Sequence, residues 1–114
     1  MKLRAIALAI GWVLVGTIIW LSVTPRPIEL GVAHGDKLGH LLAYGSVMFW
    51  FCQLYPRRAT RMACATGFIA MGVALEFVQL GLGYRSFEVA DMAADAAGVA
   101  IGWLVALPVP RLLK

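Results

Sequence analysis

Four apolar segments, each about as long as a membrane span, constrain this chain more than any other feature of its sequence. They cover residues 5–23, 38–55, 62–83 and 92–109. A helix that crosses about 30 Å of hydrocarbon needs roughly 20 apolar residues, and these segments have about 18 to 22 each. The 5 prolines lie in the breaks or at segment ends, which leaves the helix interiors intact. The pattern predicts an all-α, integral membrane bundle of four transmembrane helices.

Composition and length support this fold class. The chain has 114 residues, of which 61% are hydrophobic and 14% charged, whereas soluble domains are about half apolar and a quarter charged. The length predicts a single domain over residues 1–114. The apolar runs are continuous rather than alternating, which excludes a transmembrane β-barrel. The net charge is +4, but no basic stripe stands apart from the apolar runs, so the expected partner is the lipid bilayer and not nucleic acid.

The first segment also has the basic start of a signal peptide, with Lys2 and Arg4 before an apolar run. The run is longer than a usual signal core, and no A-x-A cleavage motif follows it. We therefore interpret it as a membrane anchor.

The distribution of charge predicts the orientation. Basic residues gather at both termini and in the second break, at Lys2, Arg4, Arg57, Arg58, Arg61, Arg111 and Lys114. Because Lys and Arg are enriched in cytoplasmic loops, both termini are expected to be cytoplasmic. All 6 acidic residues fall at the opposite helix ends or in the loops there, at Glu29, Asp36, Glu76, Glu88, Asp91 and Asp95. These ends are therefore expected to be extracytoplasmic.

Ionisable residues from three segments converge on this predicted extracytoplasmic face. An ionised group inside a span costs roughly 2.5–3.5 kcal/mol on insertion scales and usually marks a functional site. Residues three or four apart share a helix face, so Asp36, His40 and Tyr44 form one stripe, with Lys37 beside it. Glu76 and Gln79 share a face of the third segment. Glu76 lies about seven residues from the segment end, roughly 10 Å deep, where no helix cap explains it.

The fourth segment begins with two carboxylates one turn apart. A helix N-cap would explain Asp91, but Asp95 lies a turn inside the apolar run. Gly98 and Gly102 have the small-residue spacing that lets helices approach closely. We read that motif as packing within the chain, which would bring both carboxylates against a neighbouring helix.

These residues define a candidate site. The predicted catalytic residues are Glu76, His40 and Asp91, and the predicted ligand-binding residues are Asp36, Lys37, Tyr44, Gln79, Arg85, Ser86 and Asp95. Glu76, Asp91 and Asp95 could act as a base or bind a hard cation such as Mg²⁺, so the metal and the cofactor stay open, as does enzymatic activity. Arg85, and otherwise Lys37, is the predicted partner of Glu76. A proton pathway is disfavoured because the inner halves of the segments carry few polar residues.

The ordered set of motifs resembles the VanZ-like family of bacterial membrane proteins. The resemblance rests on Asp36-Lys37-x-x-His40-x-x-x-Tyr44, Glu76-x-x-Gln79, Arg85-Ser86-Phe87-Glu88 and Asp91-x-x-x-Asp95-x-x-Gly98-x-x-x-Gly102. The family usually has Asn where this chain has Asp95. The resemblance implies a small multi-pass protein of the bacterial cytoplasmic (inner) membrane and cell envelope, and the family's namesake is linked to low-level resistance to the glycopeptide teicoplanin.

Two functions remain open. In the first, the polar site binds or modifies an anionic, lipid-linked cell-wall or polysaccharide component at the outer leaflet. In the second, the protein is a non-catalytic scaffold or binding module whose charges hold three helices in register. The sequence leaves the oligomeric state undetermined.

Overall fold

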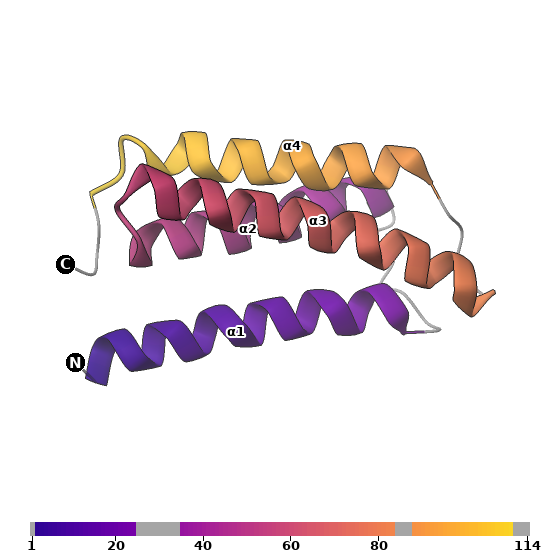
Figure 1. Cartoon of the computed structure of the whole chain (residues 1–114), viewed down its shortest axis with the longest axis horizontal. Helices are drawn as coiled ribbons and strands as arrows, with labels where there is room; N and C mark the ends of the chain where they lie inside the picture. Colours follow the sequence, from indigo (N-terminus) through magenta and orange to yellow (C-terminus); the bar gives the residue numbers. More distant parts are fainter. Residues whose placement is uncertain (1, 25–34, 84–87, 111–114) are drawn as a thin grey trace.

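The described residues form an antiparallel bundle of four helices (Figure 1). The computed structural model describes residues 2–24, 35–83 and 88–110, and of Asp36 only the backbone. The helices are α1 (Lys2–Val23), α2 (Gly35–Leu54), α3 (Arg58–Leu82) and α4 (Val89–Ala106). The all-α prediction is confirmed. Each helix starts slightly earlier than predicted, at residues 2, 35, 58 and 89 rather than 5, 38, 62 and 92, because charged and small residues extend the helices beyond the apolar runs.

Short connections set the antiparallel order. Residues 55–57, which include Pro56, join α2 to α3. α3 ends at Leu82 and is capped by Gly83, whose φ of 82° is the left-handed conformation that glycine adopts readily at a helix C-terminus. As a result, the start of α1 lies at the same end of the bundle as the end of α2, the start of α3 and the end of α4 (Figure 1).

Three of the four described helices are long and apolar enough to cross a membrane, namely α1, α3 and α4. The prediction of four such spans therefore holds for three. α2 carries Lys37, His40 and Gln53 within 20 residues, which lowers its hydropathy. α2 can carry these polar residues because it is the most enclosed helix of the described bundle. It packs most extensively against α4, and its apolar core side chains, such as Val47 and Met48, are fully inaccessible.

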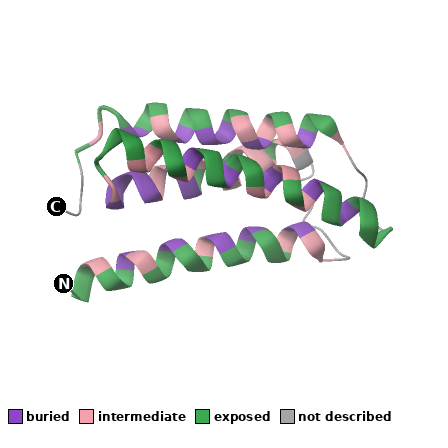
Figure 2. Ribbon diagram, in the orientation of Figure 1, coloured by how far each residue is buried: buried purple, intermediate pink, exposed green. Residues whose placement is uncertain are grey.

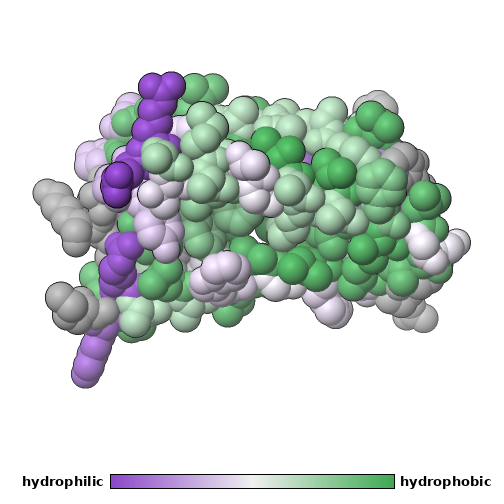
Figure 3. Space-filling model, viewed as in Figure 1, coloured by the Kyte–Doolittle hydropathy of each residue, from purple (hydrophilic) through white to green (hydrophobic). Residues whose placement is uncertain are grey.

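The outer surface of the bundle is apolar. Figure 3 shows apolar surface along the length of the molecule, with hydrophilic residues gathered at the end where α1 begins. In Figure 2 the exposed residues of α1 lie on the side facing away from the other helices. Exposed large apolar side chains include Leu3, Ile6, Trp12, Val13 and Trp20 of α1, Phe77 and Leu80 of α3, and Leu104 and Val105 of α4. Apolar surface this extensive marks a membrane or protein contact rather than a water-facing surface.

α2 and α4 approach closely through glycines. A Cβ atom at Gly98 would lie 2.5 Å from the carbonyl oxygen of Leu41, and one at Gly102 would collide with the carbonyl oxygen of Gly45. The predicted intramolecular role of the Gly98 and Gly102 motif is confirmed. Backbone-to-backbone packing of this kind fixes the axial position of the α4 carboxylates relative to α2.

Two arginines bind backbone carbonyl groups at the C-terminal end of α2 and at the residue that follows it. Arg61 donates from Nε to the Tyr55 oxygen and from Nη2 to the Cys52 oxygen, both at 2.8 Å, and Arg4 donates from Nη1 to the Leu54 oxygen at 3.0 Å. The last carbonyls of a helix lack partners within the helix, and its C-terminus favours positive charge. Residues interpreted from the sequence as topology signals therefore also cap a helix.

Candidate functional site

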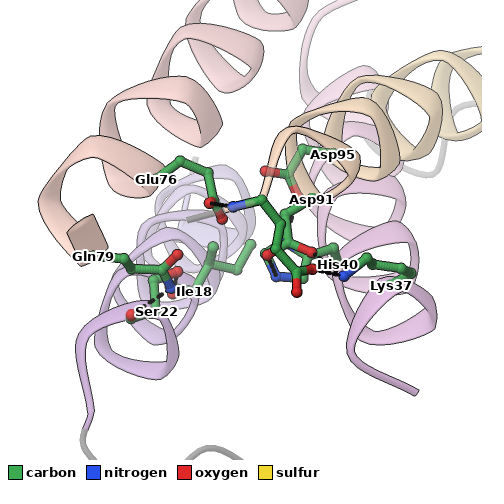
Figure 4. A network of polar contacts seen from close by, with 9 residues as sticks. Ile18, Ser22, Lys37, His40, Glu76, Gln79, Asp91 and Asp95 are labelled. Carbon is green, nitrogen blue, oxygen red and sulfur yellow. Dashed lines mark hydrogen bonds and ion pairs between the residues drawn. The ribbon is translucent and has the colours of Figure 1, made fainter. Parts of the chain in front are cut away.

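A cluster of ionisable side chains lies at the opposite end of the bundle, where α2 starts, α3 ends and α4 starts (Figure 4). His40 comes from α2, Glu76 from α3, and Asp91 and Asp95 from α4. The carboxylates are deeply buried, with Glu76 exposed by 1%, Asp95 by 2% and Asp91 by 7%. Because buried charges are costly unless they are paired, the contacts within this cluster decide what it can do.

His40 lies between the two carboxylates of α4. Its Nδ1 is 2.6 Å from Oδ1 of Asp95, and its Nε2 is 3.8 Å from Oδ2 of Asp91. The buried ring of Tyr44 stacks on the imidazole, with centroids 6.5 Å apart and planes inclined by 6°. The hydrogen bond and the stacked ring together hold the imidazole in one orientation.

Lys37 brings a positive charge to the same carboxylates. Its Nζ lies 2.9 Å from Oδ1 of Asp91 and also pairs with the carboxylate of Glu88. The Lys37 side chain is 25% exposed, so this ammonium lies at the boundary between the buried cluster and its surroundings. Although Asp91 Oδ1 is close to Lys37, it has no hydrogen-bond partner among the described residues.

α3 shapes the other side of the cluster. Oε2 of Glu76 accepts a hydrogen bond of 2.9 Å from the backbone N–H of Glu88, which links the end of α3 to the residue that precedes α4. Gly72, one turn before Glu76, leaves room for Asp95, because a Cβ there would lie 2.6 Å from Oδ2 of Asp95. A larger residue at position 72 would displace the carboxylate that holds His40.

Gln79 points away from the cluster. Its Nε2 donates to the backbone oxygen of Ser22 at 2.7 Å, and the Ser22 hydroxyl donates to the Ile18 oxygen at 2.8 Å (Figure 4). Gln79 therefore ties α3 to α1 within the bundle.

Most of the predicted site residues come together. The structure gathers Lys37, His40, Tyr44, Glu76, Asp91 and Asp95, whereas Gln79 faces α1. Arg85, Ser86 and the side chain of Asp36 lie outside the described residues. The predicted pairing of Glu76 with Arg85 therefore stays a prediction.

The N-cap interpretation of Asp91 is wrong. α4 begins at Val89 and its N-cap is Glu88, so Asp91 lies in the first turn, inside the helix. The sequence predicted a later start for α4, at residue 92, because Asp91 separates Val89 and Ala90 from the continuous apolar run. A carboxylate in the first turn still has a favourable interaction with the positive end of the helix dipole.

Sequence reasoning missed three residues that shape the site. Glu88 supplies a carboxylate to Lys37 and a backbone donor to Glu76. Gly72 makes room for Asp95, and the backbone oxygen of Ser22 accepts the hydrogen bond from Gln79. Glu88 could have been found by asking which acid near the start of the fourth segment pairs with Lys37. The other two carry no signal without knowledge of which helices are neighbours.

Comparisons with known proteins give a family match. The model of the family described as VanZ/LLP1 matches residues 5–113. The chain is 31% identical, over 106 residues, to a protein of Schizosaccharomyces pombe that is described as uncharacterised. The alignment covers 90% of this chain and 64% of that relative, so the chain spans less than two thirds of the relative's length. No solved structure matches significantly. Together with the three apolar helices, the family match indicates a multi-pass membrane protein.

Proposed function

Because the chain belongs to the VanZ/LLP1 family, we propose that it is a single-domain protein of the cell envelope whose buried polar cluster binds or modifies an anionic, lipid-linked cell-wall or polysaccharide component. The observation that carries this proposal is the convergence of His40, Glu76 and Asp91 from three helices on one buried point. Buried ion pairs often stabilise a protein no better than apolar packing does, so a cluster this rich in charge is more economically explained by ligand binding.

The proposed chemistry follows from exposure and charge. Lys37 is the partly exposed cation of the cluster, so its ammonium is placed to meet a phosphate or carboxylate group that arrives from outside. An ammonium is a standard point-charge partner for phosphate. Deeper in the cluster, Glu76 and Asp91 offer carboxylates that can accept a proton from a bound hydroxyl or water. Binding of the ligand needs the Lys37 ammonium, and modification of the ligand needs both the ammonium and the carboxylates.

The proposed topology has α2 as a fourth span and both termini in the cytoplasm. It is supported by the basic residues at one end of the bundle, which include Arg4 and Arg61, and by the acidic cluster at the other. The proposed location is the bacterial cytoplasmic membrane, and the family context suggests a role in glycopeptide resistance. A similar protein occurs in fission yeast, so the proposed ligand is a chemical class rather than one bacterial polymer.

A structural scaffold is the competing function, and one observation favours it. The ion pairs Lys37–Asp91 and His40–Asp95 both join α2 to α4, which the glycine contacts already hold together. A network that only locks two helices would have this pattern.

Substitutions at the predicted site residues separate these two functions. We expect Glu76→Gln, His40→Ala and Arg85→Ala to abolish glycopeptide resistance in cells that depend on this protein, while the amount of folded protein in the membrane stays nearly normal. The measurements are growth on teicoplanin and thermal unfolding in detergent. Leu80→Ala is the matched control, because Leu80 lies on α3 near Glu76 but is 56% exposed. A loss of resistance that follows the loss of folded protein would support the scaffold, and full resistance in all three variants would exclude both functions.

Single cysteines test the topology. In a background with Cys52→Ala and Cys64→Ala, an impermeant thiol reagent added to intact cells should label Val89→Cys and leave Ala59→Cys unlabelled. Val89 is 67% exposed and begins α4 beside the cluster, and Ala59 is exposed at the basic end. Both cysteines should react after the membrane is permeabilised. Labelling of Ala59→Cys alone on intact cells would place the cluster in the cytoplasm.

A further inference from the structure

His40, Glu76 and Asp91 form a set of donor atoms suited to a metal ion. One ligand atom from each residue lies within 4.8 Å of the other two. In a zinc site with bonds of about 2.0–2.2 Å, donor atoms lie roughly 3–3.5 Å apart. Shortening the separations by up to about 1–2 Å, within the reach of side-chain rotation, would close the set around an ion. Each donor comes from a different helix, so the positions of three helices fix the site.

Asp95 orients the imidazole for this task. When Nδ1–H of His40 donates to Asp95 Oδ1, at 2.6 Å, the lone pair of Nε2 is free and faces Asp91. Metal-binding histidines commonly have a carboxylate behind them in this way, which fixes the tautomer and makes the ligand more basic. In this arrangement Asp95 acts as a positioning residue for His40 rather than as a direct ligand of the ion.

The balance of charge points independently to a further cation. Asp91 is 7% exposed, and its Oδ1 is contacted by Nζ of Lys37 at 2.9 Å, but that ammonium is shared with the carboxylate of Glu88. Buried carboxylates are costly unless enough positive charge compensates them. At the described part of this end, the carboxylates of Glu76, Glu88, Asp91 and Asp95 outnumber the cationic groups Lys37 and His40. A divalent ion would reduce this excess of negative charge.

We propose that His40 Nε2, Glu76 and Asp91 bind a divalent transition-metal ion, with Zn²⁺ as the best fit. An imidazole nitrogen with two carboxylate oxygens suits Zn²⁺, whereas Mg²⁺ prefers oxygen donors and retains water. Three protein ligands leave at least one position open, as in zinc sites that bind a substrate or water. The open position would take an oxygen of the anionic headgroup, so this inference rests on the proposed function and specifies how the same cluster binds its ligand.

Metal titration of the purified protein tests this proposal. The full chain, carrying Cys52→Ala and Cys64→Ala to remove thiol ligands, would be treated with chelator in detergent and titrated with ZnCl₂ by calorimetry and with CoCl₂ by visible absorption. We expect about one ion per chain and a cobalt spectrum of nitrogen and oxygen ligands. Asp95→Asn keeps an acceptor for Nδ1–H but removes the negative charge behind the imidazole, so it should weaken binding by about 10–100-fold without changing the cobalt spectrum. His40→Ala and Glu76→Gln should weaken it more, and Leu80→Ala should leave it unchanged.

Thermal unfolding without metal shows whether each variant is folded. Because Glu76→Gln is nearly isosteric, it keeps the test valid if His40→Ala does not fold. A parent protein that binds no Zn²⁺ or Co²⁺, or binding that survives both ligand substitutions, would overturn the metal site. If the parent protein bound no metal but folded Glu76→Gln lost resistance, the proposed function would stand without the metal. Conversely, if Glu76→Gln lost metal binding but kept full resistance, the metal site would stand and the proposed function would be excluded.

Discussion

A Gly102→Ala variant is expected to lose at least about 1–3 kcal/mol of unfolding free energy, the usual cost of overpacking a core. The added methyl group would collide with the backbone oxygen of Gly45. A flexible side chain could rotate away, but here the obstacle is the α2 backbone, so the two helices must separate. Because α2 and α4 carry His40, Asp91 and Asp95, their separation should also disperse the polar cluster. Denaturant unfolding in mixed micelles, compared with the parent chain, measures the effect.

Two glycines elsewhere provide the control. A Cβ at Gly16 of α1 or Gly67 of α3 would meet nothing within 4 Å. Alanine is favoured over glycine in a helix interior by about 1 kcal/mol, so Gly16→Ala and Gly67→Ala should leave stability unchanged or slightly higher. If Gly102→Ala behaved like these two variants, α2 and α4 would not be in backbone contact.

An Asp95→Ala variant is expected to lose about 3–5 kcal/mol of unfolding free energy, the cost of breaking a buried ion pair by removing one partner. Asp95 is 2% exposed and holds Nδ1 of His40 at 2.6 Å. Its removal leaves that nitrogen without its partner and opens a void opposite Gly72. The loss should be smaller if water reaches the imidazole, since the His40 side chain is 20% exposed. Denaturant unfolding of Asp95→Ala and of the parent chain in the same mixed micelles measures this difference in unfolding free energy.

Asparagine at this position separates hydrogen bonding from charge. Asp95→Asn keeps an oxygen that can accept from Nδ1–H, so most of the stability should be retained. The double variant Asp95→Ala with His40→Ala should lose less stability than the sum of the two single losses. The reason is that it removes both members of the pair, so no unpaired partner stays buried. Equal losses for Asp95→Ala and Asp95→Asn, together with strict additivity in the cycle, would mean that the contact contributes nothing.

The sequence predicted the helices well because the apolar runs are long, and a long apolar run has few alternatives to a helix. Their starts were misplaced because apolarity marks the part of a helix that faces lipid or core, while the backbone continues through charged residues such as Arg58. α2 was the least well predicted. Its polar residues face other helices rather than lipid, and hydropathy along a single chain cannot distinguish these two surroundings.

The site was predicted to the extent that spacing determines it. Residues four apart share a helix face, which correctly placed His40 beside Tyr44 and Asp91 beside Asp95. Gln79 shares a face with Glu76, but that face spans the boundary between two neighbours, so Glu76 points to α4 and Gln79 to α1. Which helix lies on each side of α3 is a property of the assembled bundle, and periodicity within one segment cannot reveal it.

The two arginines at the end of α2 have a consequence for biogenesis. The carbonyl groups they bind belong to Cys52 and Leu54 of α2 and to Tyr55 directly after it, yet Arg4 lies in α1 and Arg61 in α3. During synthesis, α2 emerges before the residue that completes its C-terminus and before α3 and α4, which cover its polar residues. On the proposed four-span topology, α2 is therefore a poor candidate for independent release from the translocon into lipid. It should be retained until the second hairpin is made, so that the bundle enters the membrane as a cooperative unit.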